Sequence, residues 1–451
     1  MIGEERFHEI SDQVLRYSQG DQTEILLLGE ESNLTRFANS EIHQNVSLSN
    51  HLLIIRSAFG KKIGTSVTNR FEKEFLKRAV ERSHEIAKLQ PENPDFHSFP
   101  EPKGFQEIPI YFEKTHLYSP EERAEGVKRI VEEARKRGFR AFGAFTTGAS
   151  EVAVANSLNL FSYAKGTDAF LNTILMADSG SGYAQSASRD VRKINVEEVT
   201  RSALLKAERS QNPVEVEPGE YEVVLEEYAV STLLNFLGFM GLGALAYQEG
   251  RSFLCGKLGE RITGENVTLW DDGLNQKGFA FPFDFEGVPK EKVTLIEEGI
   301  GKGVVYDTLT ARKEKRRSTG HSTGSPVWGP IPMNLFMQSG NSTLEEMVKS
   351  TKRGIYVTRF HYTNVVEPMR TVITGMTRGG TYLIENGEIT RPVKNLRFTQ
   401  SILEALSRVT YISKEQKLVG EGEGYGIRFA TGTVAPAIKC EKFHFTGVTE
   451  F

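Results

Sequence analysis

The sequence has little of what marks several protein classes. It contains only two cysteines, Cys255 and Cys440, in 451 residues, so a disulfide framework is not expected, as in a reducing compartment. It has only 16 prolines and no long low-complexity tract, which argues against a disordered chain. Its net charge of −4 offers no general attraction to nucleic acid or to an anionic membrane. These absences leave an ordinary soluble globular protein.

The chain also shows no export or membrane segment. Its first residues do not combine a basic region with an apolar stretch, so we expect no secretory signal and a cytoplasmic location. Residues 228–247 carry no charge and are long enough to cross a bilayer. However, Ser231, Thr232 and Asn235 interrupt this run, and no excess of Lys or Arg flanks it. We therefore predict a buried core helix there.

The length of the chain predicts two domains. In residues 1–210, helical periodicity alternates with predicted antiparallel strands, which indicates an α+β domain. Residues 211–220 contain Pro213, Pro218 and Gly219 and are predicted to be a linker. Residues 221–451 read mostly as strands, so we expect a largely antiparallel, barrel-like sheet around the buried helix.

Turn residues divide the predicted strands into short pieces. Asn50 is taken as a turn between strands 42–48 and 51–59. Glycine or asparagine likewise separates four further strands, predicted at 141–147, 151–155, 158–164 and 168–177. Asn386 and Gly387 form the strongest short hairpin signal, because a type I′ turn needs a positive φ at both positions.

The pattern Gly-x-Ser-x-Gly occurs at Gly320, Ser322 and Gly324. In a serine hydrolase this pattern is a strained turn between an apolar strand and a helix. Here it follows the basic run 312–317 and precedes the proline-rich run 325–330, neither of which suits that role. We interpret it as a flexible basic loop.

Metal-binding patterns are missing, because no two of the nine histidines are four or five residues apart. His8 and His84 are each followed by glutamate, but Asp12 and Lys88 stand where His-Glu-x-x-His needs its second histidine. An assembly of distant residues stays open, with three candidates: His321, His361 and Cys440.

Three other partial motifs lack the structural context that their chemistry needs. Ser162 and Lys165 match Ser-x-x-Lys but lie in strand-like sequence. Gly241 and Gly243 match part of a dinucleotide fingerprint, yet they lie within an apolar run where close helix packing explains small residues. Residues 420–426 are rich in glycine, but their two glutamates would repel a phosphate, so we predict a mobile loop.

Several blocks, each modest alone, occur together in one order along nearly the whole chain. They are TRFANSEIHQ at 35–44, GKKIG at 60–64, YDT at 306–308, PMNL at 332–335, YLIENGEI at 382–389 and PVKN at 392–395. In these blocks the chain resembles the TldD/PmbA family, whose members were described as modulators of DNA gyrase and are regarded as metallopeptidases and their partner subunits.

The resemblance also shows where this chain departs from the family. Active members carry His-Glu-x-x-x-His on the buried helix of the second domain, where two histidines hold zinc and the glutamate polarises water. The matching positions here are Asn235, Phe236 and Met240. The family's third ligand, a cysteine, is expected near 422–430, where this chain has none, and Cys440 lies beyond that loop. An amide and a thioether are poor zinc ligands, and a phenyl ring cannot act as a base.

The resemblance therefore implies a PmbA- or TldE-like protein in peptide proteolysis or peptide maturation. We expect no cofactor on this chain and a catalytic zinc in a TldD-like partner of a dimeric complex. Exposed strands of the second domain are expected to hold unfolded peptide by strand addition. Two alternatives remain: a non-enzymatic homodimer that binds peptides or proteins, and a hydrolase with a divergent site around Ser322.

Overall fold

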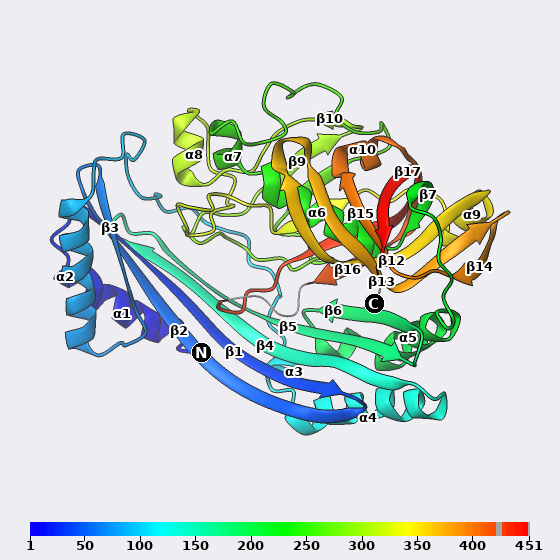
Figure 1. Cartoon of the computed structure of the whole chain (residues 1–451). Helices are drawn as coiled ribbons and strands as arrows, with labels where there is room; N and C mark the ends of the chain where they lie inside the picture. The colour runs from blue at the N-terminus through cyan, green and yellow to red at the C-terminus, as the bar shows by residue number, and fades with distance from the viewer. Residues whose placement is uncertain (421–425, 450–451) are drawn as a thin grey trace.

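The computed structural model describes residues 1–420 and 426–449. Two β-sheets organise the chain, and all six strands of the first precede all eleven strands of the second. The first sheet is long and curved, and the second forms a compact body against its inner side (Figure 1). This mixed α+β architecture confirms the predicted fold class.

The first sheet is antiparallel throughout, in the order β3-β2-β1-β4-β5-β6. Its strands are β1 (Gln22–Ala38), β2 (Glu41–Phe59), β3 (Lys62–Thr68), β4 (Arg140–Asn156), β5 (Phe161–Met176) and β6 (Ser181–Ser188). The helices of this part are α1 (Glu4–Tyr17), α2 (Lys73–Leu89), α3 (Glu113–His116), α4 (Pro120–Lys136) and α5 (Val196–Arg209), with the 3₁₀ turn η1 (Val191–Lys193).

Alternate residues of strand β1 belong to different hydrophobic cores. Ile25 and Leu27 pack in a cluster with Phe7 and Leu76 of helices α1 and α2. Leu26 packs in another cluster with residues such as Phe283 of the C-terminal part. Successive side chains of a strand point to opposite faces, so the continuous apolar run 25–28 reflects burial on both faces.

Several strand boundaries predicted from turn residues are wrong. Strand β2 runs through Asn50, which pairs with Glu30 of β1, and strand β4 likewise replaces two predicted strands. Strand β5 also replaces two predicted strands. The sheet tolerates these breaker residues because neighbouring strands satisfy their backbone groups. The turn that the prediction missed lies at Asn39 and Ser40, with φ of 50° and 64°.

The second sheet closes on itself. Strand β17 pairs with β15 and β7, and the order β17-β15-β13-β12-β7 returns to β17, as a barrel requires. Its pairs are mostly antiparallel, but β11–β17 and β12–β7 are parallel. Its strands are β7 (Gly219–Leu225), β8 (Leu269–Asp272), β9 (Lys292–Glu297), β10 (Ile300–Gly301), β11 (Asn334–Met337), β12 (Arg353–Glu367), β13 (Val372–Glu385), β14 (Glu388–Pro392), β15 (Leu396–Ser401), β16 (Val409–Gly420) and β17 (Gly432–Val448).

Helix α6 (Glu227–Gly241) packs against the strands of this sheet. Most of its residues are buried in the largest hydrophobic cluster, which confirms a core helix for residues 228–241. The rest of the predicted run, 242–247, does not continue it, because a second helix begins at Ala244. No helix among the described residues is long and apolar enough to span a membrane. The shorter helices are α7 (Ala244–Gln248), α8 (Thr308–Lys313), α9 (Leu344–Lys349) and α10 (Ile402–Ser407).

The predicted hairpin at Asn386 and Gly387 is confirmed, because it joins β13 to β14 with φ of 50° and 83° at the two positions. The two glycines at the end of helix α6 have a packing role. A Cβ on Gly241 would lie 2.7 Å from the Phe253 ring, and one on Gly243 would lie 2.0 Å from the Pro330 carbonyl oxygen. Close packing explains these glycines, and no strand leads into them as a dinucleotide motif requires.

Candidate functional site

Helix α6 places Asn235 and Phe236 on the wall of a cavity of about 370 Å³. Most of the helix is apolar on every side and therefore buried, while these two residues and Phe239 remain partly exposed. The other lining residues come from the chain before and in strand β11 and from the start of β17: Ile331, Pro332, Met333, Leu335, Thr431 and Gly432. No charged residue lines this cavity in the described part of the chain.

The polar groups at this position already satisfy one another. The Thr433 hydroxyl donates to Asn235 Oδ1 over 2.5 Å, and Asn235 Nδ2 lies 3.5 Å from the Ser231 hydroxyl. Thr433 is fully buried, so this bond fixes the amide against strand β17. An amide so engaged, beside a phenyl ring, does not fit a zinc ion or an activated water.

Met240 lies apart from the first cavity. Five residues along an α-helix turn the side chain by about 140°, and Met240 lines a neighbouring cavity of about 380 Å³. Phe239 lines both cavities, and its ring contacts the Trp328 ring at a centroid distance of 5.6 Å. The structure thus brings Asn235 and Phe236 together but separates Met240 from them.

The rim of the two cavities exposes large apolar side chains. Phe239 is 51% exposed and Trp328 is 58% exposed, and Val327 and Met369 are also exposed. Arg251 is the one charged residue that lines the second cavity among the described residues. An apolar surface of this kind suits contact with another chain more than acid–base chemistry.

The Gly320–Gly324 segment is buried, so its interpretation as a flexible loop is wrong. His321 is fully buried, and Ser322 is nearly so. Asp284 Oδ2 accepts from the Ser322 backbone N–H at 2.8 Å, and a Cβ on Gly320 would lie 2.3 Å from the Pro289 carbonyl oxygen. The segment is therefore held by buried acceptors and tight packing rather than left in solvent.

His321 does not serve Ser322 as a base. Its Nε2 lies 2.8 Å from Asp271 Oδ1, and its Nδ1 lies 2.9 Å from the Thr319 hydroxyl. The Ser322 hydroxyl accepts from the Gly324 N–H at 3.2 Å. A nucleophilic serine needs a base within hydrogen-bonding distance of its oxygen, and none is recorded for Ser322 in the described residues.

Buried ionisable side chains lie around this segment, and their pKa values differ from the usual ones. Burial, with Lys290 nearby, lowers the pKa of His321. Burial would raise the pKa of Asp271, but His321 and Lys290 hold it below its usual range. Burial also lowers the pKa of Lys290, which lies near Asp271 and Asp284. Burial and the Glu286 charge raise the pKa of Asp284 to about 7.

A second set of buried charges crosses from the first sheet to the C-terminal part. Arg56 Nε donates to Glu24 Oε1 at 2.8 Å, and Arg56 Nη2 lies 3.9 Å from Glu286 Oε1. Burial raises the pKa of Glu24 to about 7, against the opposing effect of Arg56. Burial and Glu286 raise the pKa of Asp307 to about 6. These groups hold the two parts together.

The distant residues left open as metal ligands stay apart. No group of three or more His, Cys, Asp or Glu side chains suited to a metal ion occurs in residues 1–420 and 426–449. Cys440 is fully buried in strand β17, where burial raises the pKa of its thiol to about 12.

The glycine-rich run predicted at 420–426 lies largely outside the described residues. Ser162 and Lys165 both lie in strand β5, three residues apart and thus on opposite faces, so they cannot act as Ser-x-x-Lys.

Sequence reasoning missed the contacts that join the two parts of the chain. Arg428, just before strand β17, ion-pairs with buried Asp168 of β5 and donates to the Ser32 hydroxyl at 2.9 Å. Arg189 donates to the Ala280 carbonyl at 2.7 Å. These partners lie 90 to nearly 400 residues apart in sequence. No local pattern could have indicated them.

The closed second sheet, its core helix and the long antiparallel first sheet define a two-part α+β protein. A model of the PmbA/TldA metallopeptidase C-terminal domain matches residues 218–447. The chain belongs to the TldD/PmbA family. A metalloprotease TldD homologue of Buchnera aphidicola (strain APS) is 26% identical over 91% of this chain and 92% of its own length.

Other relatives match over about half of their length. A metalloprotease of Methanocaldococcus jannaschii is 30% identical over 44% of this chain and 45% of its own. Among solved structures, TldE from Thermococcus kodakarensis has a TM-score of 0.87 at 24% identity, over 98% of this chain and all of its own. A Thermotoga maritima protein, named as a candidate modulator of a DNA gyrase, has a TM-score of 0.86 at 23% identity. At such identities the two structures support the fold alone.

Proposed function

We propose that this protein is the non-zinc subunit of a dimeric metallopeptidase complex that acts in peptide proteolysis or peptide maturation. The zinc, its water and the general base belong in this proposal to a TldD-like partner. This chain supplies interface and peptide-binding surface, and holds no cofactor. Its place of action is proposed to be the cytoplasm, and its division into domains at 1–210 and 221–451 is part of the same proposal.

One observation carries the proposal. The helix positions that match the family's zinc ligands and base hold Asn235, Phe236 and Met240, and their surroundings are apolar. Curated relatives are named metalloproteases, so the family's chemistry is proteolytic while this chain lacks the side chains for it. The Asn235–Thr433 hydrogen bond gives the amide a structural task. A subunit that keeps the fold but not the ligands fits both facts.

The exposed rim supports a role in holding other chains. Phe239 lines both cavities, and its ring contacts Trp328, which lines the second, so an unfolded peptide or a partner could bury both rings there. Strand β16 pairs with β17 alone among the described strands, and residues 340–342 bond its other edge only at 412–414. The rest of that edge is left for strand addition. Strand addition tolerates many sequences, as processing of varied peptides requires.

The test is co-expression with a paralogue from the same genome that bears His-Glu-x-x-x-His. We expect the two chains to co-purify and the complex to cleave an unfolded peptide in a zinc-dependent way. This chain purified alone is expected to hold no stoichiometric zinc by metal analysis and to cleave nothing. Zinc and peptidase activity in the isolated chain would overturn the proposal.

The same preparation separates the two alternatives. A homodimer that binds peptide without the paralogue, and does not exchange into a complex with it, would favour the non-enzymatic binding protein. A hydrolase site around Ser322 would require that Ser322→Ala abolish an activity that chelators leave intact. The buried position of Ser322 and its lack of a base argue against that outcome.

A further inference from the structure

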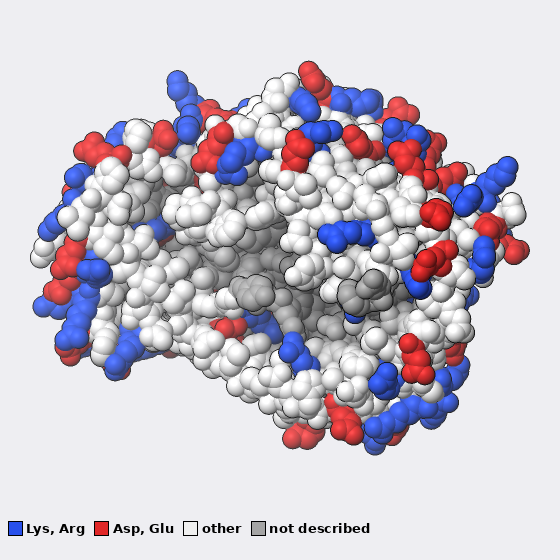
Figure 2. Space-filling model, viewed as in Figure 1, with Lys and Arg blue, Asp and Glu red and all other residues white. Residues whose placement is uncertain are grey.

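A cavity of about 670 Å³ lies between the two parts of the molecule. Its walls come from the end of strand β6, turn η1 and the chain near Phe112 on one side, and from residues 275–280 and strand β16 on the other. Figure 2 shows the surface hollowed between the first sheet and the C-terminal part. The volume is typical of a pocket that encloses a small ligand or a few residues of peptide.

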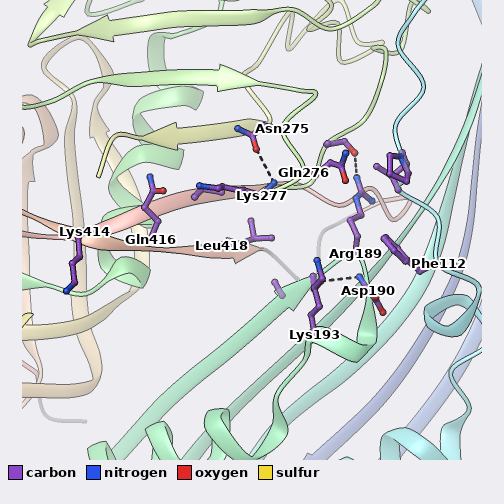
Figure 3. Close-up of a pocket in the computed structure, with 17 residues that line it drawn as sticks. Phe112, Arg189, Asp190, Lys193, Asn275, Gln276, Lys277, Lys414, Gln416 and Leu418 are labelled. Carbon is purple, nitrogen blue, oxygen red and sulfur yellow. Dashed lines mark hydrogen bonds between the residues drawn. The ribbon is translucent and has the colours of Figure 1, made fainter. Parts of the chain in front are cut away.

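The pocket gathers positive charge. Lys193, Lys277 and Lys414 line it, together with Arg189, and Figure 3 shows them around its walls. Among the residues that the structure describes, no carboxylate oxygen lies within 4 Å of the ammonium nitrogen of any of these three lysines, so none of them forms an ion pair. The whole chain carries a net charge of −4, so the four cationic side chains at this cavity give it a charge opposite in sign to that of the chain.

The acidic residue in the pocket is already neutralised. Asp190 accepts three hydrogen bonds from the Arg192 side chain, at 2.9, 3.0 and 2.7 Å. The hydrogen bonds from Arg192 are the main reason why the pKa of Asp190 lies below its usual range, so this carboxylate stays ionised and paired. The charges left facing the cavity are the three ammonium groups and the Arg189 guanidinium.

Arg189 is an unusual buried charge. It is only 8% exposed, and it donates to the Thr167 carbonyl at 3.1 Å and to the Ala280 carbonyl at 2.7 Å. Its Nε has no hydrogen-bond partner among the described residues. The acidic group nearby, Asp168, is ion-paired with Arg428. Burial lowers the pKa of Arg189 to about 10, so the group remains charged at neutral pH.

An uncompensated buried cation costs stability, unless an anion shares its field. A cleft lined by charges of one sign focuses its potential and concentrates ligands of the opposite sign. The burial of Arg189 and the cluster of three exposed lysines are two independent observations, and both indicate an anionic ligand. The pocket is suited to a ligand that carries several negative charges.

The rest of the lining is suited to an extended chain. Lys414, Gln416 and Leu418 all come from strand β16 and line the pocket, so this strand forms one of its walls (Figure 3). Gln276 adds an amide that can donate or accept, and Ile110 and Val434 add apolar surface. Mixed apolar, amide and cationic groups along a strand match a peptide better than a compact inorganic anion.

We propose that this pocket binds an acidic segment of the peptide, with its carboxylates at Lys193, Lys277 and Lys414. The inference rests on the proposed function, because it names the kind of peptide that such a subunit selects. Arg189 contributes its charge from the floor of the pocket, while its hydrogen bonds join the two parts of the chain. Acidic peptides would then be retained near the partner's zinc, and neutral ones would be released sooner.

The experiment is fluorescence anisotropy with two labelled unfolded peptides of one length, one alternating Glu and Ser and the other Gln and Ser. The double variant K277E/K414E is compared with wild type and with K257E, since Lys257 is exposed and lines none of the pockets described above. We expect the Glu peptide to bind about ten-fold more tightly to wild type than to the double variant, as two exposed charge pairs are reversed. We expect K257E to bind as wild type does.

Salt and a competing anion separate the sources of binding. The affinity for the Glu peptide is expected to fall as salt rises through about 0.1 M, where the screening length is about 10 Å. Inorganic phosphate is expected to compete weakly. Phosphate binding tighter than that of the Glu peptide, and lost in K277E/K414E, would overturn the assignment to a peptide. Unfolding curves of all variants check that these exposed substitutions leave the fold intact.

The outcomes also separate this inference from the proposed function. Equal binding of the Glu and Gln peptides, or a Glu peptide that K277E/K414E binds as wild type does, would overturn the acidic pocket while leaving the subunit role intact. Binding of neither peptide would also overturn it. Failure of the subunit role would appear instead as no complex with the zinc-bearing paralogue, whatever the peptide results.

Discussion

Thr433 donates its hydroxyl hydrogen to Asn235 across 2.5 Å, and so ties strand β17 to helix α6 where relatives in this family are expected to hold zinc. The donor is fully buried, and the acceptor lies on the wall of an apolar cavity. A position that is expected to serve chemistry in one set of relatives therefore serves packing here. The contribution of this hydrogen bond to the stability of the protein can be measured.

Removing the Thr433–Asn235 hydrogen bond should destabilise the protein, and the size of the loss should depend on which of the two residues is replaced. Asn235→Ala leaves the buried Thr433 hydroxyl unpaired, so we expect a loss of about 1–3 kcal/mol in the free energy of unfolding. Thr433→Val removes the buried donor itself, and should cost less. Urea unfolding of both single variants and the double variant should give a coupling energy of about 1 kcal/mol. Additivity within about 0.3 kcal/mol would show that the bond is not formed.

The aromatic rim should matter for activity rather than for stability. Phe239→Ala and Trp328→Ala remove exposed rings, so their unfolding midpoints should stay near wild type. We expect the activity of the complex with the zinc-bearing paralogue to fall at least about ten-fold, as for aromatic groups buried at an interface. The matched control is Leu89→Ala, because Leu89 is 85% exposed at the far end of helix α2. Equal losses in all three variants would contradict a specific role for the rim.

Glu24 should make stability fall as the pH rises. Burial raises its pKa from 4.5 to about 7, and its buried Oε2 has no hydrogen-bond partner among the described residues. The folded state therefore binds the proton more tightly than the unfolded state does. The stabilising contribution is full below pH 4.5 and is lost as the pH rises through about 7. Asp284 and Asp307, with pKa values of about 7 and about 6, act in the same direction.

The variant Glu24→Gln tests this directly, because its amide cannot ionise yet still offers an oxygen to Arg56. Chemical unfolding between pH 4.5 and pH 7 should show a flatter profile for the variant. At about 1.4 kcal/mol per pH unit, the difference from wild type across this interval is at most about 3 kcal/mol. Glu345→Gln, an exposed control, should keep the wild-type profile. Identical profiles for Glu24→Gln and wild type would rule out Glu24 as a source.

Asp168 should be among the most costly single substitutions. It is fully buried and ion-pairs with Arg428, whose Nε lies 2.9 Å from Asp168 Oδ2. Asp168→Asn leaves the buried Arg428 guanidinium without the carboxylate that it pairs with. We expect a loss of about 3–5 kcal/mol in the free energy of unfolding. The exposed Asp178→Asn should change it by less than about 0.5 kcal/mol. A small loss for Asp168→Asn would mean that Arg428 finds another acceptor.

Much of the fold could be predicted because the pattern that specifies it is local. The apolar run from Tyr228 indicates a buried helix, and Asn386-Gly387 indicates a hairpin, since both depend on neighbours in sequence. Strand lengths could not be predicted in this way. Asn50 breaks a strand in isolation, but in β2 it pairs with Glu30 of strand β1. A partner strand overrides local turn preference by satisfying the backbone.

The features of the candidate site can also be divided into those that follow from the sequence and those that depend on the tertiary structure. The sequence by itself determined that Asn235, Phe236 and Met240 cannot supply zinc ligands and a base, because that follows from side-chain chemistry. Only the tertiary structure decided that Met240 faces a different cavity, and that His321 is buried against Asp271. It also brought Lys193, Lys277 and Lys414 to one pocket. These residues are too far apart in sequence for any periodicity to relate them, and the electrostatic field that they share exists only once the two sheets have met.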